Sequence, residues 1–279
     1  MQAPLPRVDL LFVIDDTASM QQEQEALSSE LASLAADLDA RGVAWQVGVV
    51  TTSMSAEAGG WLVGSPYVVT PHTDDRDTVL ADLLRVGTGG TSPEAGFAAA
   101  VEALSLSVAS GPNAGFRRPD AVLHTIFVSD ADDQSDGWLG GDPGGVFLDA
   151  LAAEAAQTGL PALASAIVGP LPSGCSSVAG TAQPGFRYAD VVAAAGGAAL
   201  SICAADFGRL LDNLGDASIA LPTRFALREQ PTLGSVAVTV DGVAAEGWEL
   251  LATEAVLAFD EAPPAGSRIG VSYVVRNDG

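Results

Sequence analysis

The sequence predicts an α/β protein: a mostly parallel, doubly wound sheet with helices on both faces, followed by a small all-β module. Apolar runs of strand length alternate with segments of helical period up to about residue 220. These runs are largely apolar on both faces, which is typical of strands buried on both faces of a parallel sheet. Beyond Leu221-Pro222 the helical period is lost, and short runs separated by turn residues replace it. We therefore expect two domains, residues 1–220 and residues 221–279.

In the first domain we expect strands over residues 8–15, 45–51, 121–129, 162–168 and 198–202. Residues 61–70, interrupted by Gly64-Ser65-Pro66, suit either a hairpin or an edge strand. The helical segments are 21–38, 77–86, 93–108, 146–157, 188–195 and 206–217. In the first of these, leucines recur every three or four residues and Gly42 follows the end. Pro93 suits a first helical turn, and we expect Glu94 to interact there with the helix dipole.

The second domain shows alternating runs at residues 224–227, 235–240, 248–250, 255–259 and 268–275. Turn sequences such as Asp241-Gly242 separate them. Its aromatic residues are the expected core of this sandwich-like module: Phe225, Trp248, Phe259 and Tyr273.

The charge balance narrows the classes of partner. The chain of 279 residues has 35 acidic and 12 basic side chains, a net charge of −23, and every basic residue is an arginine. Nucleic acid and anionic membranes would be repelled, whereas divalent cations would be attracted. The absence of lysine excludes Schiff-base chemistry and a Walker-type phosphate lysine.

Polar side chains follow the first predicted strand at once. Asp15, Asp16, Thr17 and Ser19 lie within five positions. Such residues cap helices well, and their oxygens are equally the ligands that hard divalent cations prefer. Taken alone, this segment leaves capping and metal binding open.

Two further segments favour metal binding. Thr91 ends a glycine-rich turn before a helix, and Asp130 ends the apolar strand 121–129. Because ligands bind beyond the carboxyl ends of parallel strands, these oxygens are expected at one edge of the sheet. Thr88 is a second candidate in the glycine-rich turn.

The order of these segments resembles the metal-ion-dependent adhesion site of the von Willebrand factor A (vWA) domain family, of the bacterial type. Asp15-Asp16-Thr17-Ala18-Ser19 is similar to its Asp-x-Ser-x-Ser element, with threonine at the first serine, and Gly90-Thr91 and Ser129-Asp130 are similar to the other two elements. The resemblance spans about residues 8–219 and implies a Rossmann-like vWA fold. It also implies that Thr17, Ser19 and Thr91 ligate the ion directly or through water. Asp15 and Asp130 would then hold ordered waters or ligate weakly. The implied ion is Mg²⁺, with Mn²⁺ or Ca²⁺ as alternatives.

Other acids lie near the proposed site. Asp16, Asp132 and Asp133 are candidates for a second cation site or for the rim of the first. A solvated acidic loop is the simpler interpretation, because Pro143 stands where a calcium loop would need its glutamate.

Cys175 and Cys203 lie 28 positions apart (203 − 175) in turn-like sequence. We expect a disulfide and hence an extracellular, cell-surface or periplasmic location, although two unpaired cysteines are the alternative. The first residues show no signal-peptide pattern, and no apolar run reaches the roughly 20 residues of a membrane span.

The sequence shows no credible set of catalytic residues. Asp130-Ala131-Asp132 is similar to the Asp-x-Asp of haloacid-dehalogenase phosphatases, but no lysine is present to shield a nucleophile. His124, inside an apolar strand, suits a core position, and His72 an exposed loop. We expect a non-enzymatic, metal-dependent adhesion or assembly module whose ion coordinates an exposed carboxylate of a protein partner. The alternatives are an intracellular vWA subunit assisting a motor ATPase or chelatase, and a structural domain whose ion only neutralises clustered acids.

Overall fold

The computed structural model describes residues 7–55, 58–90, 92–106, 111–177, 180–204, 224–227, 229–252, 255–261, 263 and 267–275. The chain forms two compact units, one over Arg7–Ser218 and one that includes Ile219–Gly279. The domain boundary predicted after residue 220 lies outside the described residues, as does the helix predicted over residues 206–217.

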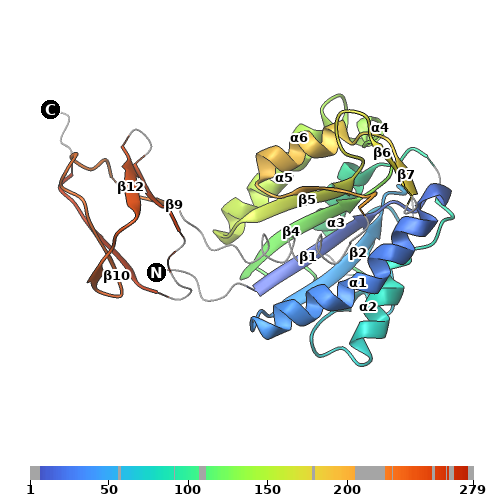
Figure 1. The fold of residues 1–279 in the computed structure, drawn as a ribbon, viewed down its shortest axis with the longest axis horizontal. Helices are drawn as coiled ribbons and strands as arrows, with labels where there is room; N and C mark the ends of the chain where they lie inside the picture. Colours follow the sequence, from blue (N-terminus) through green and yellow to red (C-terminus); the bar gives the residue numbers. More distant parts are fainter. Residues whose placement is uncertain are drawn as a thin grey trace. The chain divides into compact units, whose positions relative to one another are not determined.

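One six-stranded sheet organises the first unit (Figure 1). Its strands are β1 (Arg7–Ile14), β2 (Trp45–Thr51), β3 (Val68–Val69), β4 (Ala121–Val128), β5 (Ala162–Val168) and β8 (Ala199–Ser201). They are ordered β3-β2-β1-β4-β5-β8. All neighbours pair in parallel except β3, which pairs antiparallel with β2 at the edge. Within residues 61–70 the outcome is therefore an edge strand.

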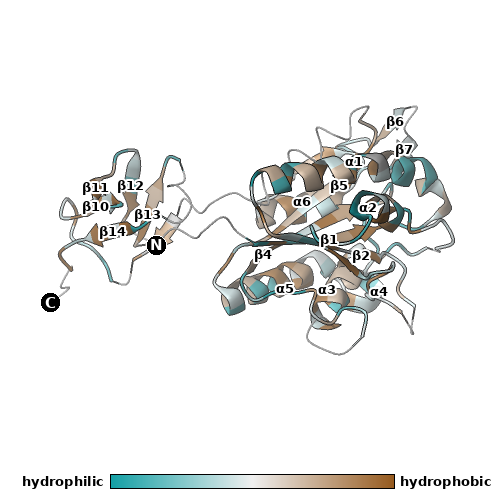
Figure 2. Ribbon diagram, turned by 90° about the horizontal axis from the view of Figure 1, so that it is seen from below, coloured by the Kyte–Doolittle hydropathy of each residue, from teal (hydrophilic) through white to brown (hydrophobic). Residues whose placement is uncertain are grey.

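Helices cover both faces of this sheet. They are α1 (Gln21–Ala40), α2 (Arg76–Leu84), α3 (Gly96–Leu106), α5 (Pro143–Thr158) and α6 (Phe186–Ala195). Figure 2 shows α1 and α2 on one side of the sheet and α3 and α5 on the other. Leu11 and Val13 of β1 belong to the cluster that packs on α3, α5 and α6, while the alternate residues Leu10 and Phe12, equally buried, point to the opposite face. The α/β fold class predicted from the sequence is confirmed.

Four aromatic rings pack together on the face covered by α3, α5 and α6. Phe97, Phe127, Phe147 and Tyr188 come one each from α3, β4, α5 and α6, and their five ring contacts span centroid distances of 5.1 to 5.6 Å. Rings at these distances attract one another beyond their burial of apolar area. The cluster therefore fixes three helices against the strand that leads to Asp130.

The start of α3 differs from the prediction. The helix begins at Gly96, so Glu94 precedes it and does not lie in its first turn. Instead, the carboxylate of Asp133 accepts the N–H of Phe97 at 2.9 Å, and the Ser135 hydroxyl accepts that of Ala98 at 3.0 Å. Side chains from a distant loop thus satisfy the N–H groups at the helix N-terminus, where the sequence had predicted Glu94 to interact with the helix dipole.

Four short elements of the first unit were not predicted: the 3-10 turn η1 (Ala18–Met20), the one-turn helix α4 (Asp136–Leu139), and the hairpin strands β6 (Cys175–Ser177) and β7 (Gly180–Ala182). Each has three or four residues, too few to show a hydrophobic period. No helix among the described residues combines the length and the apolar character that crossing a bilayer requires.

The second unit contains two three-stranded antiparallel sheets. Its strands are β9 (Arg224–Ala226), β10 (Ala237–Val240), β11 (Val243–Ala244), β12 (Trp248–Leu251), β13 (Val256–Phe259) and β14 (Ile269–Ser272). The sheet orders are β11-β10-β14 and β12-β13-β9. Phe259 is buried in the core, with Phe225 and Trp248 packed against it, as predicted. Tyr273 is a correction: it is partly exposed, and its hydroxyl accepts the backbone N–H of Glu229.

Candidate functional site

The candidate site lies where β1 and β4 end side by side. Ile14 is in register with Thr51 on one neighbouring strand and with Val128 on the other. The backbone N–H of Asp15 then donates to the carbonyl of Val128 at 2.9 Å. Pairing of β1 with β4 therefore places the segment after Ile14 beside the segment that contains Asp130, as the sequence predicted.

Asp15 is fully buried and both of its carboxylate oxygens are occupied. Oδ1 accepts the backbone N–H of Thr17 at 2.9 Å and the Thr17 hydroxyl at 2.7 Å. Oδ2 accepts the Ser129 hydroxyl at 2.7 Å. A carboxylate satisfied in this way positions its neighbours and is poorly placed to bind a cation directly.

Two hydroxyl groups lie on the solvent side of Asp15. Thr17 is half-buried and Ser19 is exposed, and their side-chain oxygens are 3.3 Å apart. Because the Thr17 hydroxyl donates its proton to Asp15, its lone pairs remain available on the other side. Adjacent hydroxyl oxygens of this kind suit a hard divalent cation.

Asp130 completes the cluster from the end of β4. Its side chain is largely buried, and Ser19 forms a hydrogen bond with it. Burial raises the pKa of Asp130 and the charges of Asp15 and Glu94 raise it further, whereas the bond from Ser19 lowers it. An acid with this balance would be stabilised in its ionised form by a nearby cation.

The glycine-rich turn approaches the same segment. The N–H of Gly90 donates to the carbonyl of Asp16 at 2.8 Å, and Gln24 bridges the carbonyls of Asp15 and Gly87 at 2.9 Å each. A Cβ on Gly90 would fall 2.3 Å from Oδ1 of Asp16, so only glycine fits without displacement. The turn thus reaches the site through its backbone; Thr91 itself lies outside the described residues, and Thr88 is exposed.

The extra acids have protein partners. Oδ1 of Asp16 accepts the Ser53 hydroxyl at 2.8 Å. Oδ1 of Asp132 accepts the N–H of Arg187 in the first turn of α6 at 3.0 Å, and Asp133 accepts hydrogens at the start of α3. Two of the three therefore serve helix N-termini, and a second cation site remains a prediction.

Glu23 is a buried acid that sequence reasoning missed. It lies in the first turn of α1, is 1% exposed, and its Oε2 has no hydrogen-bond partner among the described residues. Burial raises its pKa, and the charges of Asp130 and Asp15 raise it further. The only signal in the sequence was spacing: Glu23 follows Ser19 by four residues, about one helical turn.

Cys175 lies in the segment after β5, and Cys203 lies in the turn after β8. Cys175 and Cys203 form the predicted disulfide, with Cα atoms 6.1 Å apart. The hairpin of β6 and β7, which begins at Cys175, and the residue after it each contact the cluster once. The N–H of Gln183 donates to the carbonyl of Asp130 at 2.7 Å, and Gly180 packs so closely on Glu23 that a Cβ there would overlap Oε1.

These side chains fit a cation held mainly by hydroxyl groups. Among the described residues, no three His, Cys, Asp or Glu side chains converge as a carboxylate-rich metal site would require. A cluster of hydroxyls backed by buried carboxylates, with the hydroxyls open to solvent, leaves room for water or a partner's oxygen on the ion.

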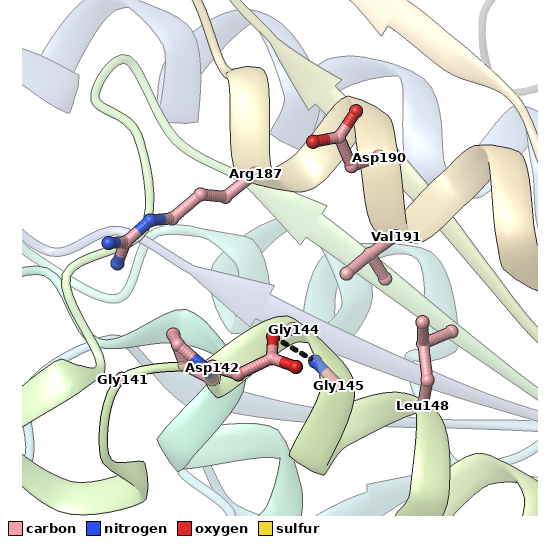
Figure 3. A pocket seen from close by; sticks show the side chains of 9 residues that line it. Gly141, Asp142, Gly144, Gly145, Leu148, Arg187, Asp190 and Val191 are labelled. Carbon is pink, nitrogen blue, oxygen red and sulfur yellow. Dashed lines mark hydrogen bonds between the residues drawn. The ribbon is translucent and has the colours of Figure 1, made fainter.

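A hollow of about 290 Å³ lies between α5 and α6, and its side chains form no comparable set of cation ligands (Figure 3). Asp142 accepts the N–H of Gly145 there, and Arg187 points away from the hollow and pairs with Asp136. Apart from the acidic Asp190, the charged side chains of this hollow thus form hydrogen bonds or ion pairs within the protein.

The buried histidine also has a structural partner. Nε2 of His124 lies 2.8 Å from the Ser165 hydroxyl, and burial lowers its pKa from 6.5 to about 4. His72 is exposed, as predicted.

Comparison with known proteins identifies similar folds. No family model matches the chain, and no curated protein matches it. Among solved structures, proximal thread matrix protein 1 from the mussel byssus is similar at 14% identity and a TM-score of 0.51, over 83% of this chain and 52% of its own length. This chain thus matches only about half of the mussel protein. BatB from Bacteroides thetaiotaomicron is similar at 14% identity and a TM-score of 0.42, over 75% of this chain and 98% of its own. The pilus adhesin SpaC from Lactobacillus rhamnosus GG is similar at 12% identity and a TM-score of 0.48, over 98% and 39%.

Proposed function

We propose that the α/β unit is a non-enzymatic, metal-dependent protein-binding module that works in adhesion or assembly. Thr17 and Ser19 hold a divalent cation, Mg²⁺ or in its place Mn²⁺ or Ca²⁺, with Thr91 as the ligand from the glycine-rich turn. Asp15 and Asp130 act through hydrogen bonds to these hydroxyls and to water. When bound, the ion supplies a Lewis-acidic position for an exposed carboxylate of a partner protein.

The observation that carries this proposal is the position of the buried carboxylates behind hydroxyl groups that face solvent. Buried Asp15 accepts the Thr17 hydroxyl, and largely buried Asp130 bonds Ser19, so both carboxylates lie behind hydroxyls that face solvent. Few direct carboxylates leave an ion electron-poor, and an electron-poor ion binds an additional anionic ligand strongly.

The disulfide and the fold support an exported location. A disulfide between Cys175 and Cys203 is stable in an oxidising compartment and rare in a reducing cytosol. The mussel protein with a similar fold is a byssus matrix protein. Both observations favour a cell-surface, extracellular or periplasmic module over an intracellular subunit of a motor ATPase or chelatase.

A structural ion is the second candidate, and Glu23 favours it. Oε2 of its buried carboxylate has no hydrogen-bond partner among the described residues, and the carboxylate lies within electrostatic reach of Asp15 and Asp130. A cation that only neutralised these three acids would be enclosed and would have no exchangeable water.

Relaxation of water protons by bound Mn²⁺ separates the two candidates. An ion on the exposed hydroxyls retains exchanging waters, so we expect the protein to enhance Mn²⁺ relaxivity. Added acetate, as a small carboxylate, should reduce that enhancement. Bound Mn²⁺ that gives no enhancement, or one insensitive to acetate, would indicate an enclosed structural ion and contradict partner docking.

A further inference from the structure

Two hollows adjoin the proposed site on the side of Asp16. The first, about 410 Å³, is lined by Asp16 and Ser53, and continues to Met54 and Trp138. The second, about 430 Å³, shares Met54 and Trp138 and extends to Trp61. Because the two hollows share Met54, Ser55 and Trp138, they form one continuous surface, which begins at Asp16, the residue after Asp15; we call it the tryptophan groove.

Large apolar side chains line this groove and are open to solvent. Trp61 is 45% exposed and Trp138 is 43% exposed, and Met54 lies between the two hollows. Tryptophan is the residue most enriched at the energetic centres of protein interfaces, and methionine adapts to irregular partners. An exposed apolar surface of this kind marks a binding site when it adjoins polar anchoring groups.

The charges of the groove decide which part of a partner it accepts. Among the described residues that line it, the charged ones are Asp16 and Glu102, both acidic. A free carboxylate would be repelled from the hollows, so the acidic side chain of a partner belongs on the cation and an apolar side chain belongs in the groove.

We propose that the tryptophan groove binds an extended segment of a protein partner, in which an acidic residue lies close in sequence to a large apolar residue. The acidic side chain ligates the cation, and the apolar side chain packs on Met54, Trp61 and Trp138. This inference rests on the proposed function and adds the specificity that a bare carboxylate lacks, since the ion alone would bind any exposed acid.

Selection from a phage-displayed library of random linear peptides, panned on the full chain in Mg²⁺, tests the proposal. Enriched peptides should pair Asp or Glu with a nearby Leu, Ile, Phe or Trp. Trp61→Ala and Trp138→Ala should each weaken binding of the synthesised peptides by at least about tenfold, without changing Mg²⁺ affinity. Tyr67→Ala is the matched control, because Tyr67 is 47% exposed, lies outside both hollows and should leave peptide binding unchanged.

Enriched peptides that bind wild type and both tryptophan variants with the same affinity would overturn the proposal that the groove binds the partner. The proposal would also be overturned if the chain binds Mg²⁺ but enriches no peptides. Failure of the proposed function looks different: the chain binds no Mg²⁺, or enriched peptides bind equally well in EDTA. If Trp138→Ala does not fold, Trp61→Ala decides the question, because Trp61 lies in a loop outside the helices and strands.

Discussion

Asp15 and Gly90 act on the candidate site in different ways. Asp15 orients the Thr17 hydroxyl through Oδ1 and is itself held by Ser129 through Oδ2. Gly90 contributes backbone alone: its N–H bonds the carbonyl of Asp16, and the absence of a Cβ permits the contact. Asp15 therefore acts through its hydrogen bonds, and Gly90 acts by leaving room for the turn to approach Asp16.

Gly90→Ala should weaken Mg²⁺ binding at least about tenfold. The added Cβ would lie 2.3 Å from Oδ1 and 2.7 Å from the carbonyl oxygen of Asp16, so the turn that leads to Thr91 must move. Gly89→Ala is the control, because a Cβ there meets nothing within 4 Å. Calorimetric titration of both variants checks this; equal affinities would show that the close approach of the turn is irrelevant to the ion.

His124 should make stability depend on pH. Its pKa in the folded state is about 4, below the ordinary 6.5, because it is buried. The unfolded chain therefore binds more protons between these values, and the stabilisation is present above pH 6.5 and lost as pH falls toward 4. From pH 7 to 4.5 the loss should be roughly 2.5 kcal/mol.

Urea unfolding of wild type and His124→Gln at both pH values measures this loss. Other groups titrate in both proteins, so the difference between the two profiles isolates the histidine, and the variant should lose roughly 2.5 kcal/mol less than wild type on acidification. Parallel profiles would refute the assignment.

The hairpin of β6 and β7 is the element that joins the disulfide to the site. Cys175→Ser with Cys203→Ser should lower the free energy of unfolding by roughly 3–4 kcal/mol, because the bridge closes a loop of 28 residues. Denaturant unfolding measures the change, and wild type in reductant should reproduce it. A loss below about 1 kcal/mol would mean that the bridge adds little to the fold.

Long elements could be predicted from sequence because their hydrophobic pattern repeats. β2 and β5 have the predicted bounds, and α1 extends the predicted helix by two residues at Ala40. Short elements lack that repetition, which explains why α4, β6 and β7 were missed.

The candidate site was predictable only in part. Asp15 and Asp130 follow apolar strands, a local signal, and parallel pairing brings such ends together. The partners of other acids are set by tertiary contacts: Asp133 binds the start of α3, and Asp9, in an apolar run, is buried against Arg117 and Arg118. Nothing near these acids in the sequence indicates such distant partners.

At the scale of the whole molecule, charge complicates any test of metal binding. With a net charge of −23 the chain will attract divalent cations without a specific site. Screening by about 0.15 M salt weakens such diffuse attraction much more than coordination at a built site. Binding of an ion at a specific site must therefore persist in about 0.15 M salt, and its affinity must depend on the buried carboxylate of Asp15.

Calorimetric titration of Mg²⁺, Mn²⁺ and Ca²⁺ into the full chain in 0.15 M salt, on wild type, Asp15→Ala and the exposed-acid control Asp74→Ala, is the most direct test. We expect one ion per wild-type chain, with affinity reduced about 10–100-fold by Asp15→Ala and unchanged by Asp74→Ala. No binding by wild type, or equal affinity in wild type and Asp15→Ala, would contradict a metal-dependent module.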